Sequence, residues 1–589
     1  MEQLLREKTA TIVNNLYGTN FSAQEITVSQ TAKEFVGDFT VVIFSFVKIA
    51  KKNPAEVGKE IGDAIQKEIT DIESYNVVKG FVNFKLKNEF WNNFLLKASA
   101  DENFFLLPLT NKKIMVEYAG PNTNKPLHLG HIRNIFIGYS VSEILKAAGN
   151  EVVKVNIYND RGIHICKSML AYQKYGNKET PQTKNIKGDH LVGNYYVKFD
   201  QELKIQIAGL MAKGMKEEEA NKNAPLNIEA KEMLLKWEAG DSEVRALWEM
   251  MNGWVYEGFN KTYNLIGCDF NKHYKESDTY LLGKKIVEEG LKKNIFYKRL
   301  DGAVCVDLTT DGLNEKVLIR SDGTSVYITQ DLGTADLRYK DFEPNQMIYT
   351  VANEQDYHFK VLKLVTEKLE KKYAAGINHL SYGMVDLPSG RMKSREGTVV
   401  DADDLIEEMI RAAKEQTIEL GKTENFTEVE AEKLYYELGM GALKFFILKV
   451  DPRKRMIFNP KESIDFHGFT GPFIQYTYAR IQSVKRKAGI DFKSSSPIIK
   501  ANDSELQLLT QLYLYPNIIN EAANNLDPAL LANHIYLIAK SFNSFYADNS
   551  ITQAETEELK NYRLLLSDLT GAILKRGMKL LGIEVPERM

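Results

Sequence analysis

The sequence contains little cysteine and no long apolar run. Its 589 residues include three cysteines, Cys166, Cys268 and Cys305, which are far apart and show no CxxC spacing. This distribution excludes a disulfide framework, argues against a zinc site and fits a reducing cytoplasm. The most apolar stretch near the N-terminus, residues 39–50, is too short to span a bilayer, and the first residues lack a signal-peptide core. We therefore expect a cytoplasmic protein with no membrane association and no metal site of its own.

A strong charge imbalance is also absent. The 76 lysine and arginine residues and the 79 aspartate and glutamate residues give a formal net charge of −3. The chain as a whole has no electrostatic attraction to nucleic acid, so any RNA contact must depend on local basic patches. The length of 589 residues predicts three or four domains, each able to bury its own core.

The most informative stretch is residues 116–134, VEYAGPNTNKPLHLGHIRN. An apolar run enters it, a loop rich in glycine, proline and asparagine follows, and a pattern of helical apolar spacing begins at His128. A strand, a tight turn and a helix start form an anion site, because free backbone N–H groups and the positive helix end point to one place. Gly130 allows a ligand to approach the backbone, and His128 and His131 share one side of the first turn. The histidines would suit polyphosphate oxygens; a surface helix cap with two incidental histidines is the alternative.

The loop before the histidines carries a family resemblance. Glu117, Pro121, Asn122 and Lys125-Pro126 precede His-Leu-Gly-His, giving E-x-x-x-P-N-x-x-K-P-x-H-x-G-H. This pattern resembles the HIGH region of class I aminoacyl-tRNA synthetases, in the form found in arginyl-tRNA synthetases. The resemblance implies that His128, His131 and Lys125 are catalytic residues that act on ATP phosphates, with Gly130 beside them.

Around this stretch, apolar strands alternate with helices. The pattern predicts strands at residues 112–118, 152–157, 347–352 and 379–385, with helices at 131–148 and 358–372. Such alternation predicts a parallel, doubly wound, Rossmann-like α/β core whose ligands dock at the carboxyl ends of the strands. Asn159-Asp160 follows one strand and is either part of that pocket or a plain turn. A hairpin is expected at residues 317–329, around Asp322-Gly323.

Three domains are expected in this order. Residues 1–110 form an α+β domain, with helices at 4–16 and 57–69 and strands at 38–47 and 80–86. It resembles the N-terminal domain of arginyl-tRNA synthetases, which contacts the tRNA elbow; a generic folding cap is an equal alternative. Residues 111–415 form the catalytic core, with an insertion at about 170–300 whose tryptophans are core anchors. Residues 416–589 form an all-α domain resembling the anticodon-binding bundle of the family, with helices broken at Pro516 and Pro528.

A basic loop, DLPSGRMKSREGT at residues 386–398, follows the second half of the core. Its charge and its position resemble the KMSKS loop, which implies closure over ATP phosphates. Ser394 stands where the family has its second lysine, and in many arginyl enzymes a lysine before the HIGH histidine, here Lys125, replaces it. The implied ATP-binding residues are Gly130, Arg391, Met392, Lys393, Ser394 and Arg395.

The remaining site residues also follow from the resemblance. A buried guanidinium needs carboxylate partners, and Tyr327-x-x-x-Asp331 resembles the arginine pocket of the family. The implied arginine-binding residues are Glu117, Asn122, Tyr327, Asp331 and Gln355. The run GPFIQYTYARI interleaves basic and aromatic residues, which suits phosphate contacts and base stacking, although a solvated cationic helix face is the alternative. The implied tRNA-binding residues are Gln475, Tyr476, Arg480, Lys485, Arg486 and Met589.

Together these resemblances imply an arginine–tRNA ligase activity with ATP and its Mg²⁺ as cofactors. L-arginine and tRNA(Arg) are the expected partners, with tRNA needed for activation, and a monomer is usual for the family. Two rivals remain: a small-molecule nucleotidyltransferase, which the chain length and the basic helical end oppose, and a non-catalytic RNA-binding relative, which His128, His131 and Asp331 oppose.

Overall fold

The computed structural model describes residues 1–589 except 33, 387, 389–399, 423–425 and 490–498. The chain folds into two compact units. The first unit comprises residues 1–105, 480–515 and 537–573, and the second comprises residues 106–479, 516–536 and 574–589. Four helices contribute residues to both: α19 (Gly471–Ala488), α20 (Asp503–Asn525), α21 (Pro528–Asp548) and α22 (Glu557–Leu580).

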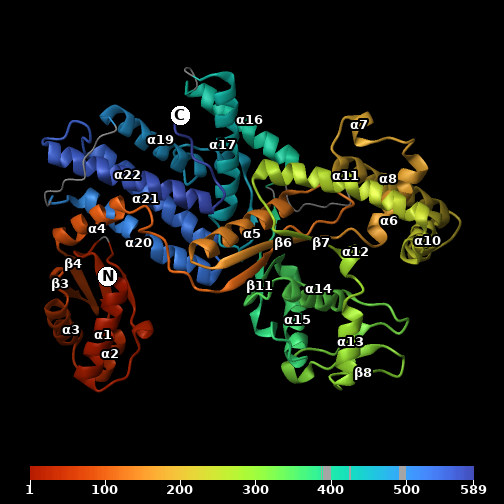
Figure 1. Cartoon of the computed structure of the whole chain (residues 1–589), viewed down its shortest axis with the longest axis horizontal. Coiled ribbons are helices and arrows are strands. Elements are labelled where there is room, and N and C mark those ends of the chain that lie inside the picture. Colours follow the sequence, from red (N-terminus) through yellow and green to blue (C-terminus); the bar gives the residue numbers. More distant parts are fainter. Residues whose placement is uncertain (33, 387, 389–399, 423–425, 490–498) are drawn as a thin grey trace. The chain divides into compact units, whose positions relative to one another are not determined.

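An antiparallel sheet with the strand order β1-β2-β4-β3 organises the N-terminal part of the first unit (Figure 1). Its strands are β1 (Val28–Gln30), β2 (Phe39–Val42), β3 (Ile72–Val78) and β4 (Phe81–Leu86). The accompanying helices are α1 (Glu2–Tyr17), α2 (Phe44–Ala50), α3 (Pro54–Glu68) and α4 (Asn88–Ala100). The helices predicted at 4–16 and 57–69 and the strand predicted at 80–86 are confirmed as α1, α3 and β4.

The strand predicted at residues 38–47 is too long. It ends at Val42, which pairs with Phe81, the first residue of β4. Beyond this pair the partner strand has turned at Gly80, whose φ is 87°, so no ladder remains for the next residues. The chain therefore continues as helix α2, although its β-branched and aromatic residues favour a strand.

A five-stranded parallel sheet organises the second unit, in the order β12-β11-β5-β6-β7. Its strands are β5 (Lys113–Glu117), β6 (Glu151–Tyr158), β7 (Lys272–Lys275), β11 (Gln346–Ala352) and β12 (Ile377–Tyr382). Glu117, the last residue of the central strand, lies between Val155 and Tyr349 on the neighbouring strands. The predicted doubly wound parallel core is confirmed, and its carboxyl edge collects the ends of several strands.

Helix α5 (Leu129–Ala147) packs closely against the sheet. A Cβ added at Gly138 would lie 2.3 Å from the Cβ of Tyr118, directly after β5. Helices α14 (Tyr327–Phe342) and α15 (Asp356–Lys368) supply Ile328, Leu332, Val361 and Val365 to a buried core with residues of β5, β6 and β11. The close contact at Gly138 fixes the height of α5 above the central strand.

The insertion expected at about residues 170–300 is helical but ends earlier, because β7 already pairs with β6 at residues 272–275. It consists of α6 (Ile163–Tyr175), α7 (Pro181–Lys184), α8 (Gly188–Met211), α9 (Glu217–Asn223), α10 (Pro225–Ala239) and α11 (Ser242–Ile266). Trp237 is 1% exposed and its ring contacts that of Trp248, with 5.4 Å between centroids. Arg245 lies 3.6 Å from the Trp237 ring centroid. Trp237 is thus a core anchor, as predicted.

The hairpin predicted at residues 317–329 forms only in part. Strand β10 (Lys316–Ile319) pairs with β9 (Val304–Val306), which pairs with β8 (Phe296–Lys298). After the Asp322-Gly323 turn, Ser325 makes a single bridge to Ile319, and α14 begins at Tyr327. The expected second strand is therefore helix, because Ile328, Leu332 and Ala335 bury one helical face in the core.

Helices and a short parallel pair complete the second unit. They are α12 (Glu276–Thr279), α13 (Gly283–Lys292), α16 (Ala402–Glu419), α17 (Glu428–Leu448), α18 (Pro460–Ser463), and strands β13 (Val385–Asp386) and β14 (Met456–Ile457). The predicted break at Pro528 is confirmed, but Pro516 lies inside α20 and does not end it. Burial of Leu512, Tyr515 and Ile519 around this proline favours a continuous helix. No helix among the described residues could cross a membrane.

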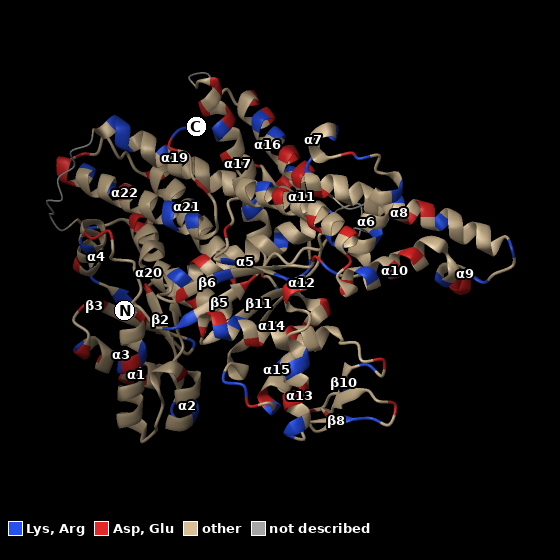
Figure 2. Ribbon diagram, turned by 45° about the vertical axis from the view of Figure 1, so that its right-hand side comes forward, with Lys and Arg blue, Asp and Glu red and all other residues tan. Residues whose placement is uncertain are grey.

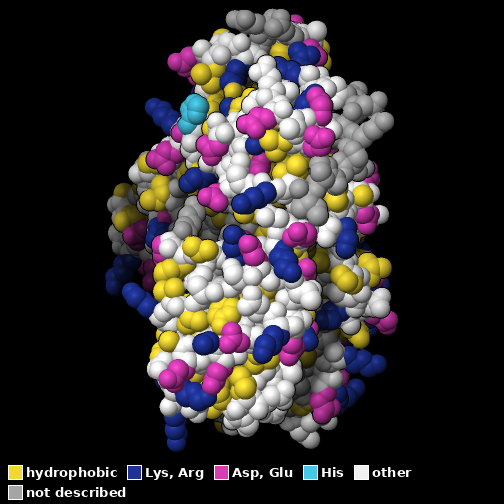
Figure 3. Space-filling model, turned by 90° about the vertical axis from the view of Figure 1, so that its left-hand side faces the viewer, with side chains coloured by type: hydrophobic (Ala, Val, Ile, Leu, Met, Phe, Trp, Pro, Cys, Tyr) yellow, Lys and Arg dark blue, Asp and Glu magenta, His cyan; other side chains and the backbone are white. Residues whose placement is uncertain are grey.

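Both signs of charge are interspersed along the ribbon (Figure 2) and over the face shown in Figure 3. This distribution agrees with the net charge of −3. Electrostatic recognition in this protein therefore depends on local groups, and the cavity of the second unit is where such groups converge.

Two helix glycines should respond oppositely to alanine. Gly138→Ala should lower the free energy of unfolding by about 1–3 kcal/mol, because the new methyl group overlaps Tyr118. Gly253→Ala, within α11, should raise it by about 0.4–1 kcal/mol, because nothing lies within 4 Å of the added Cβ. Urea unfolding followed by tryptophan fluorescence measures both. An equal effect of the two changes would contradict the tight contact at Gly138.

Candidate functional site

A cavity of about 1510 Å³ lies at the carboxyl edge of the parallel sheet. This volume exceeds the roughly 300–1000 Å³ of a typical small-molecule pocket, so the cavity has room for more than one substrate. All the described residues predicted for catalysis, ATP binding and arginine binding line it: Glu117, Asn122, Lys125, His128, Gly130, His131, Tyr327, Asp331 and Gln355. Residues more than 200 positions apart in the sequence thus share one cavity, as the sequence analysis required.

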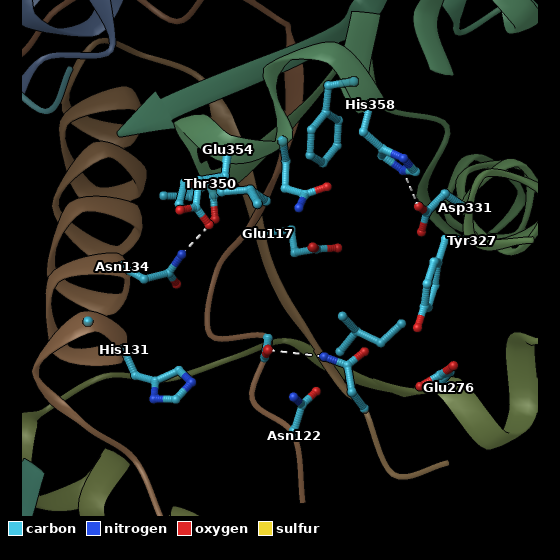
Figure 4. Close-up of a pocket in the computed structure, with 18 of the residues that line it drawn as sticks. Glu117, Asn122, His131, Asn134, Glu276, Tyr327, Asp331, Thr350, Glu354 and His358 are labelled. Atoms are coloured by element: carbon cyan, nitrogen blue, oxygen red, sulfur yellow. Dashed lines mark hydrogen bonds and ion pairs between the residues drawn. The ribbon is translucent and has the colours of Figure 1, made fainter. Parts of the chain in front are cut away.

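The histidines at the start of α5 are held in defined orientations. The backbone N–H of Gly130 donates to Nδ1 of His128, and the backbone N–H of His128 donates to Nδ1 of His131, both at 3.1 Å. Each Nδ1 is therefore an acceptor, which leaves the hydrogen of a neutral ring on Nε2. The ring centroids are 3.8 Å apart, and His131 extends from α5 toward the cavity in Figure 4. The helix start thus offers the two Nε2–H groups as donors.

Both imidazoles are neutral at pH 7. Burial, and then the nearby charge of Lys125, lowers the pKa of His128 to about 3. Burial, His128 and Lys125 also hold the pKa of His131 well below its usual range. These rings can donate hydrogen bonds to an anion without adding fixed charge to the cavity. Lys125 is the charged group of this trio.

Asn134 and Ala119 fix the entry to α5. The Asn134 Oδ1 accepts from the backbone N–H of Ala119, and its Nδ2 donates to the Thr350 carbonyl, both at 2.6 Å. Ala119 has a φ of 60°, a left-handed conformation that is rare without glycine. A strained backbone persists where its surroundings impose it, and such residues cluster at functional sites. One amide therefore joins α5 to the ends of β5 and β11.

The two ends of the predicted basic loop are attached to the same cavity. On one side, Val385 and Asp386 of β13 line it. On the other, the backbone N–H of Leu129 donates to the Val400 carbonyl at 3.2 Å, and that of Ala402 donates to the Leu127 carbonyl at 3.0 Å. The predicted ATP-binding residues Arg391, Met392, Lys393, Ser394 and Arg395 lie outside the described residues.

The opposite wall of the cavity is acidic. Tyr327 and Asp331 lie at the start of α14, and Glu276 of α12 faces the same space (Figure 4). His358 Nε2 lies 2.5 Å from Asp331 Oδ2. Burial raises the pKa of Glu276 to about 7, against the opposing effect of Arg161. Sequence reasoning missed Glu276 and His358, because no local motif marks a carboxylate on a four-residue helix or a histidine paired across two elements.

Glu117 lines the cavity but already has a cationic partner. Its carboxylate forms an ion pair with Arg338 of α14. Both side chains are buried, with 9% of Glu117 and 3% of Arg338 exposed. Burial raises the pKa of Glu117 while Arg338 opposes that rise. Separating this buried pair would leave each charge unpaired. We therefore expect the Glu117 side chain to stay in place at the floor of the cavity.

Asn159-Asp160 was expected to be either part of the pocket or a plain turn, and the structure gives the two residues different roles. Asn159 lines the cavity, and its Nδ2 donates to the Gly120 carbonyl at 3.1 Å. Asp160 is fully buried and accepts from Tyr256 Oη at 2.8 Å and from the Ser277 backbone at 2.9 Å. Asn159 therefore belongs to the pocket, while Asp160 is a structural residue that holds α11 and α12 near β6.

Gln475 is a correction to the predicted tRNA-binding residues. Its side chain is fully buried, and Nε2 donates to the carbonyls of Glu437 at 2.9 Å and Glu584 at 2.7 Å. It therefore joins α17, α19 and the C-terminal segment, and it is not accessible to RNA. Glutamine occurs on both buried and exposed faces of a helix, so the sequence pattern could not show that Gln475 is buried.

The other predicted tRNA-binding residues lie closer to the surface. Tyr476 is half-buried, with Lys422 Nζ 3.7 Å from its ring centroid. Within the first unit, Arg480 contacts Asn543, Lys485 contacts Asp568, and Arg486 is exposed. Met589 is half-buried. Their contact with tRNA stays a prediction.

The ring nitrogens give a direct test of the helix start. We expect His128 to remain neutral, with its hydrogen on Nε2, from pH 8 to pH 5, because protonation in the folded state occurs near its pKa of about 3. The unfolded chain takes up that proton near pH 6.5, so this residue weakens folding as pH falls from about 6.5 toward 3. ¹⁵N chemical shifts of labelled histidine, assigned with His128→Asn, measure the tautomer. A titration of His128 near pH 6.5 would contradict this geometry.

The chain is similar to known proteins over nearly its whole length. Three family models match the chain: tRNA synthetases class I (R), catalytic domain, at residues 100–459; DALR anticodon binding domain, at 474–589; and arginyl tRNA synthetase N terminal domain, at 2–86. The arginine–tRNA ligase of Parabacteroides distasonis is 54% identical, over 98% of each chain. That of Flavobacterium psychrophilum is 52% identical, over 100% of each chain.

Solved structures show the same fold at lower identity. The Thermus thermophilus arginyl-tRNA synthetase has a TM-score of 0.83 at 24% identity, over 100% of each chain. The Plasmodium falciparum arginyl-tRNA synthetase has a TM-score of 0.78 at 21% identity, over 99% of this chain and 98% of that one. With its three matched domains and its full-length relatives, this chain belongs to the arginyl family of class I tRNA synthetases.

Proposed function

We propose that the protein ligates L-arginine to tRNA(Arg) in two steps. The arginine carboxylate attacks the α-phosphorus of ATP, forming arginyl-adenylate and releasing pyrophosphate; a hydroxyl at the 3′ end of tRNA then attacks the arginyl carbonyl and releases AMP. Full-length similarity to arginine–tRNA ligases supports this activity. The observation that carries it is a single cavity in which His131, at the start of α5, lies across from Tyr327, Asp331 and Glu276 (Figure 4).

The donor wall suits ATP. The imidazoles of His128 and His131, whose Nε2 hydrogens are available as donors, and the side chain of Lys125 all line the cavity. Adenylate formation needs no protein nucleophile, so these groups act by holding the phosphates and by stabilising charge as it moves toward pyrophosphate. Mg²⁺ enters with ATP as part of the substrate, as is usual for this ion. Lys125 supplies the positive charge that Ser394 does not.

The acidic wall suits the arginine side chain. A guanidinium is planar, always charged and best bound by carboxylates in its plane. Asp331 and Glu276 supply these carboxylates, Tyr327 supplies a hydroxyl, and Asn122 and Gln355 line the remaining space. A neutral or shorter amino acid would leave the carboxylates unpaired, which is a strong basis for discrimination. The ion pair between Glu117 and Arg338 fixes the floor between the two walls.

The remaining domains serve tRNA in this proposal. Residues 1–110 contact the tRNA elbow, residues 111–415 carry catalysis, and residues 416–589 bind the anticodon. Tyr476, Arg480, Lys485, Arg486 and Met589 are the proposed contacts. The match to an anticodon-binding domain at residues 474–589 supports the last assignment. Activation of arginine requires bound tRNA, as the family resemblance implies.

ATP–pyrophosphate exchange tests the activity as a whole. We expect exchange that requires both arginine and tRNA(Arg), followed by aminoacylation of that tRNA. The control replaces arginine with lysine, whose ammonium group lacks the planar fork that two carboxylates recognise. Exchange with another amino acid would contradict the pocket assignment. Tight tRNA binding without exchange would instead favour the non-catalytic alternative.

The pH dependence of arginine binding tests the acidic wall. Because the pKa of Glu276 is raised to about 7, half of the free protein carries a neutral Glu276 near pH 7. A bound guanidinium favours the carboxylate form, so the KM for arginine should fall as pH rises from 6 to 8. Steady-state exchange at fixed saturating ATP measures this fall.

Two variants separate Glu276 from its neighbour. Glu276→Gln should raise the KM for arginine and remove the fall between pH 6 and 8, because no titrating group remains at this position. Asp331→Asn should raise the KM by roughly 10-fold or more but preserve the pH-dependent fall. A pH dependence unchanged by Glu276→Gln would exclude Glu276 from the guanidinium site.

A further inference from the structure

Arg133 is a fully buried arginine on α5, two residues beyond His131. Residues two apart on a helix do not share a face, so Arg133 is directed away from the imidazoles and into the protein. Burying a charged side chain is costly unless it is paired and hydrogen-bonded. The partners of Arg133 therefore indicate why this position carries a guanidinium.

Three backbone carbonyls accept hydrogen bonds from Arg133. Its Nη2 donates to the carbonyls of Pro452 at 3.1 Å and Lys454 at 2.6 Å, and its Nη1 donates to the Met384 carbonyl at 3.3 Å. Burial lowers its pKa to about 10, so the group stays charged at pH 7. The fixed fork of a guanidinium can bridge several chain segments at once, which an ammonium group cannot do in the same geometry.

The two segments bound by Arg133 are pressed together. Gly383 donates its backbone N–H to the Pro452 carbonyl at 2.8 Å, and Met456 donates to the Met384 carbonyl at 3.1 Å. A Cβ added at Gly383 would lie 2.5 Å from the backbone of Lys454. Strands β13 and β14 pair over only two residues each, which is too short to be stable without support. The hydrogen bonds from Arg133 to both segments supply that support.

These segments form one side of the cavity. Gly383, Met384, Val385 and Asp386 line it, and so do Arg453 and Arg455. The guanidinium of Arg455 is half-exposed and paired with Asp386 through Nε. This side adjoins the start of α5, because Arg133 belongs to that helix. None of the acidic-wall residues Tyr327, Asp331 and Glu276 belongs to the segments that Arg133 binds.

We propose that Arg133 is a positioning residue for the ATP side of the cavity, where it holds the segments carrying Asp386, Arg453 and Arg455 against the start of α5. This role rests on the proposed function. Arg133 does not touch substrate. It determines where the cationic side chains of residues 453 and 455 meet phosphate, and it leaves the arginine pocket unchanged.

A second buried arginine provides a matched comparison. Arg338, 3% exposed, pairs with Glu117 at the floor of the cavity and belongs to α14, the helix of the acidic wall. Replacement of either arginine by lysine keeps the charge and removes the planar fork. A general loss of folding would lower the exchange rate of both variants without changing either KM, whereas a positioning role raises a different KM in each variant.

The experiment measures tRNA-dependent ATP–pyrophosphate exchange by the full chain, varying ATP and arginine separately. Arg133→Lys should raise the KM for ATP by roughly 10-fold and lower the exchange rate, with the KM for arginine within about twofold of the parent. Arg338→Lys should show the reverse division. Arg411→Met, which removes an exposed arginine of α16, controls for loss of surface charge and should change neither KM.

Gly383→Ala decides the question if Arg133→Lys does not fold. It separates the same two segments and leaves the guanidinium in place, so it should also raise the KM for ATP alone. Equal changes in both KM values, or no change in either, would overturn the role of Arg133. An inactive parent protein would instead overturn the proposed function itself, so the two failures are distinguishable.

Discussion

Backbone N–H groups at the start of a helix have no acceptors within that helix, and this constraint organises the second unit around the start of α5. The protein meets it with two histidines, each of which accepts a backbone hydrogen bond through Nδ1. The backbone N–H of Leu129 donates to the Val400 carbonyl, and that of His131 donates to the His128 carbonyl. A Cβ at Gly130 would lie 3.0 Å from the His128 ring, so a side chain at this position would press on that imidazole. The same residues that cap the start of α5 are therefore the ones proposed to bind the ATP phosphates.

Burial, in addition to the residue types, determines which side chains of the cavity are charged. Burial keeps the two imidazoles neutral on one wall, and it raises the pKa of Glu276 on the other. Two buried arginines hold the walls in place: Arg338 through a carboxylate, and Arg133 through backbone carbonyls. The second arrangement satisfies a buried, charged guanidinium with neutral acceptors, two residues beyond His131. Two buried arginines thus support the cavity in different ways: one pairs with a carboxylate, and the other binds backbone carbonyls.

Much of the fold could be predicted because local patterns and tertiary burial agree over most of the chain. Strands β5, β6, β11 and β12 of the parallel sheet and helix α5 are cases of this agreement, whereas β7 was not predicted. The exceptions have physical reasons. Residues 326–329 include β-branched and aromatic side chains, yet α14 begins at Tyr327 because Ile328 and Leu332 bury a helical face. Residues 43–47 lose their strand because the partner strand begins opposite Val42.

The sequence by itself determined the family, the order of the domains and the cavity residues carried by short motifs, since spacing along the chain fixes which side chains share a helical turn or a strand end. Only the tertiary structure decided the roles that depend on distant partners. It placed Glu276 opposite His131, paired Glu117 with Arg338, buried Gln475 and connected Arg133 to residues more than 250 positions away. Burial and pairing of charge are properties of the assembled core, and no local pattern of residue types encodes them.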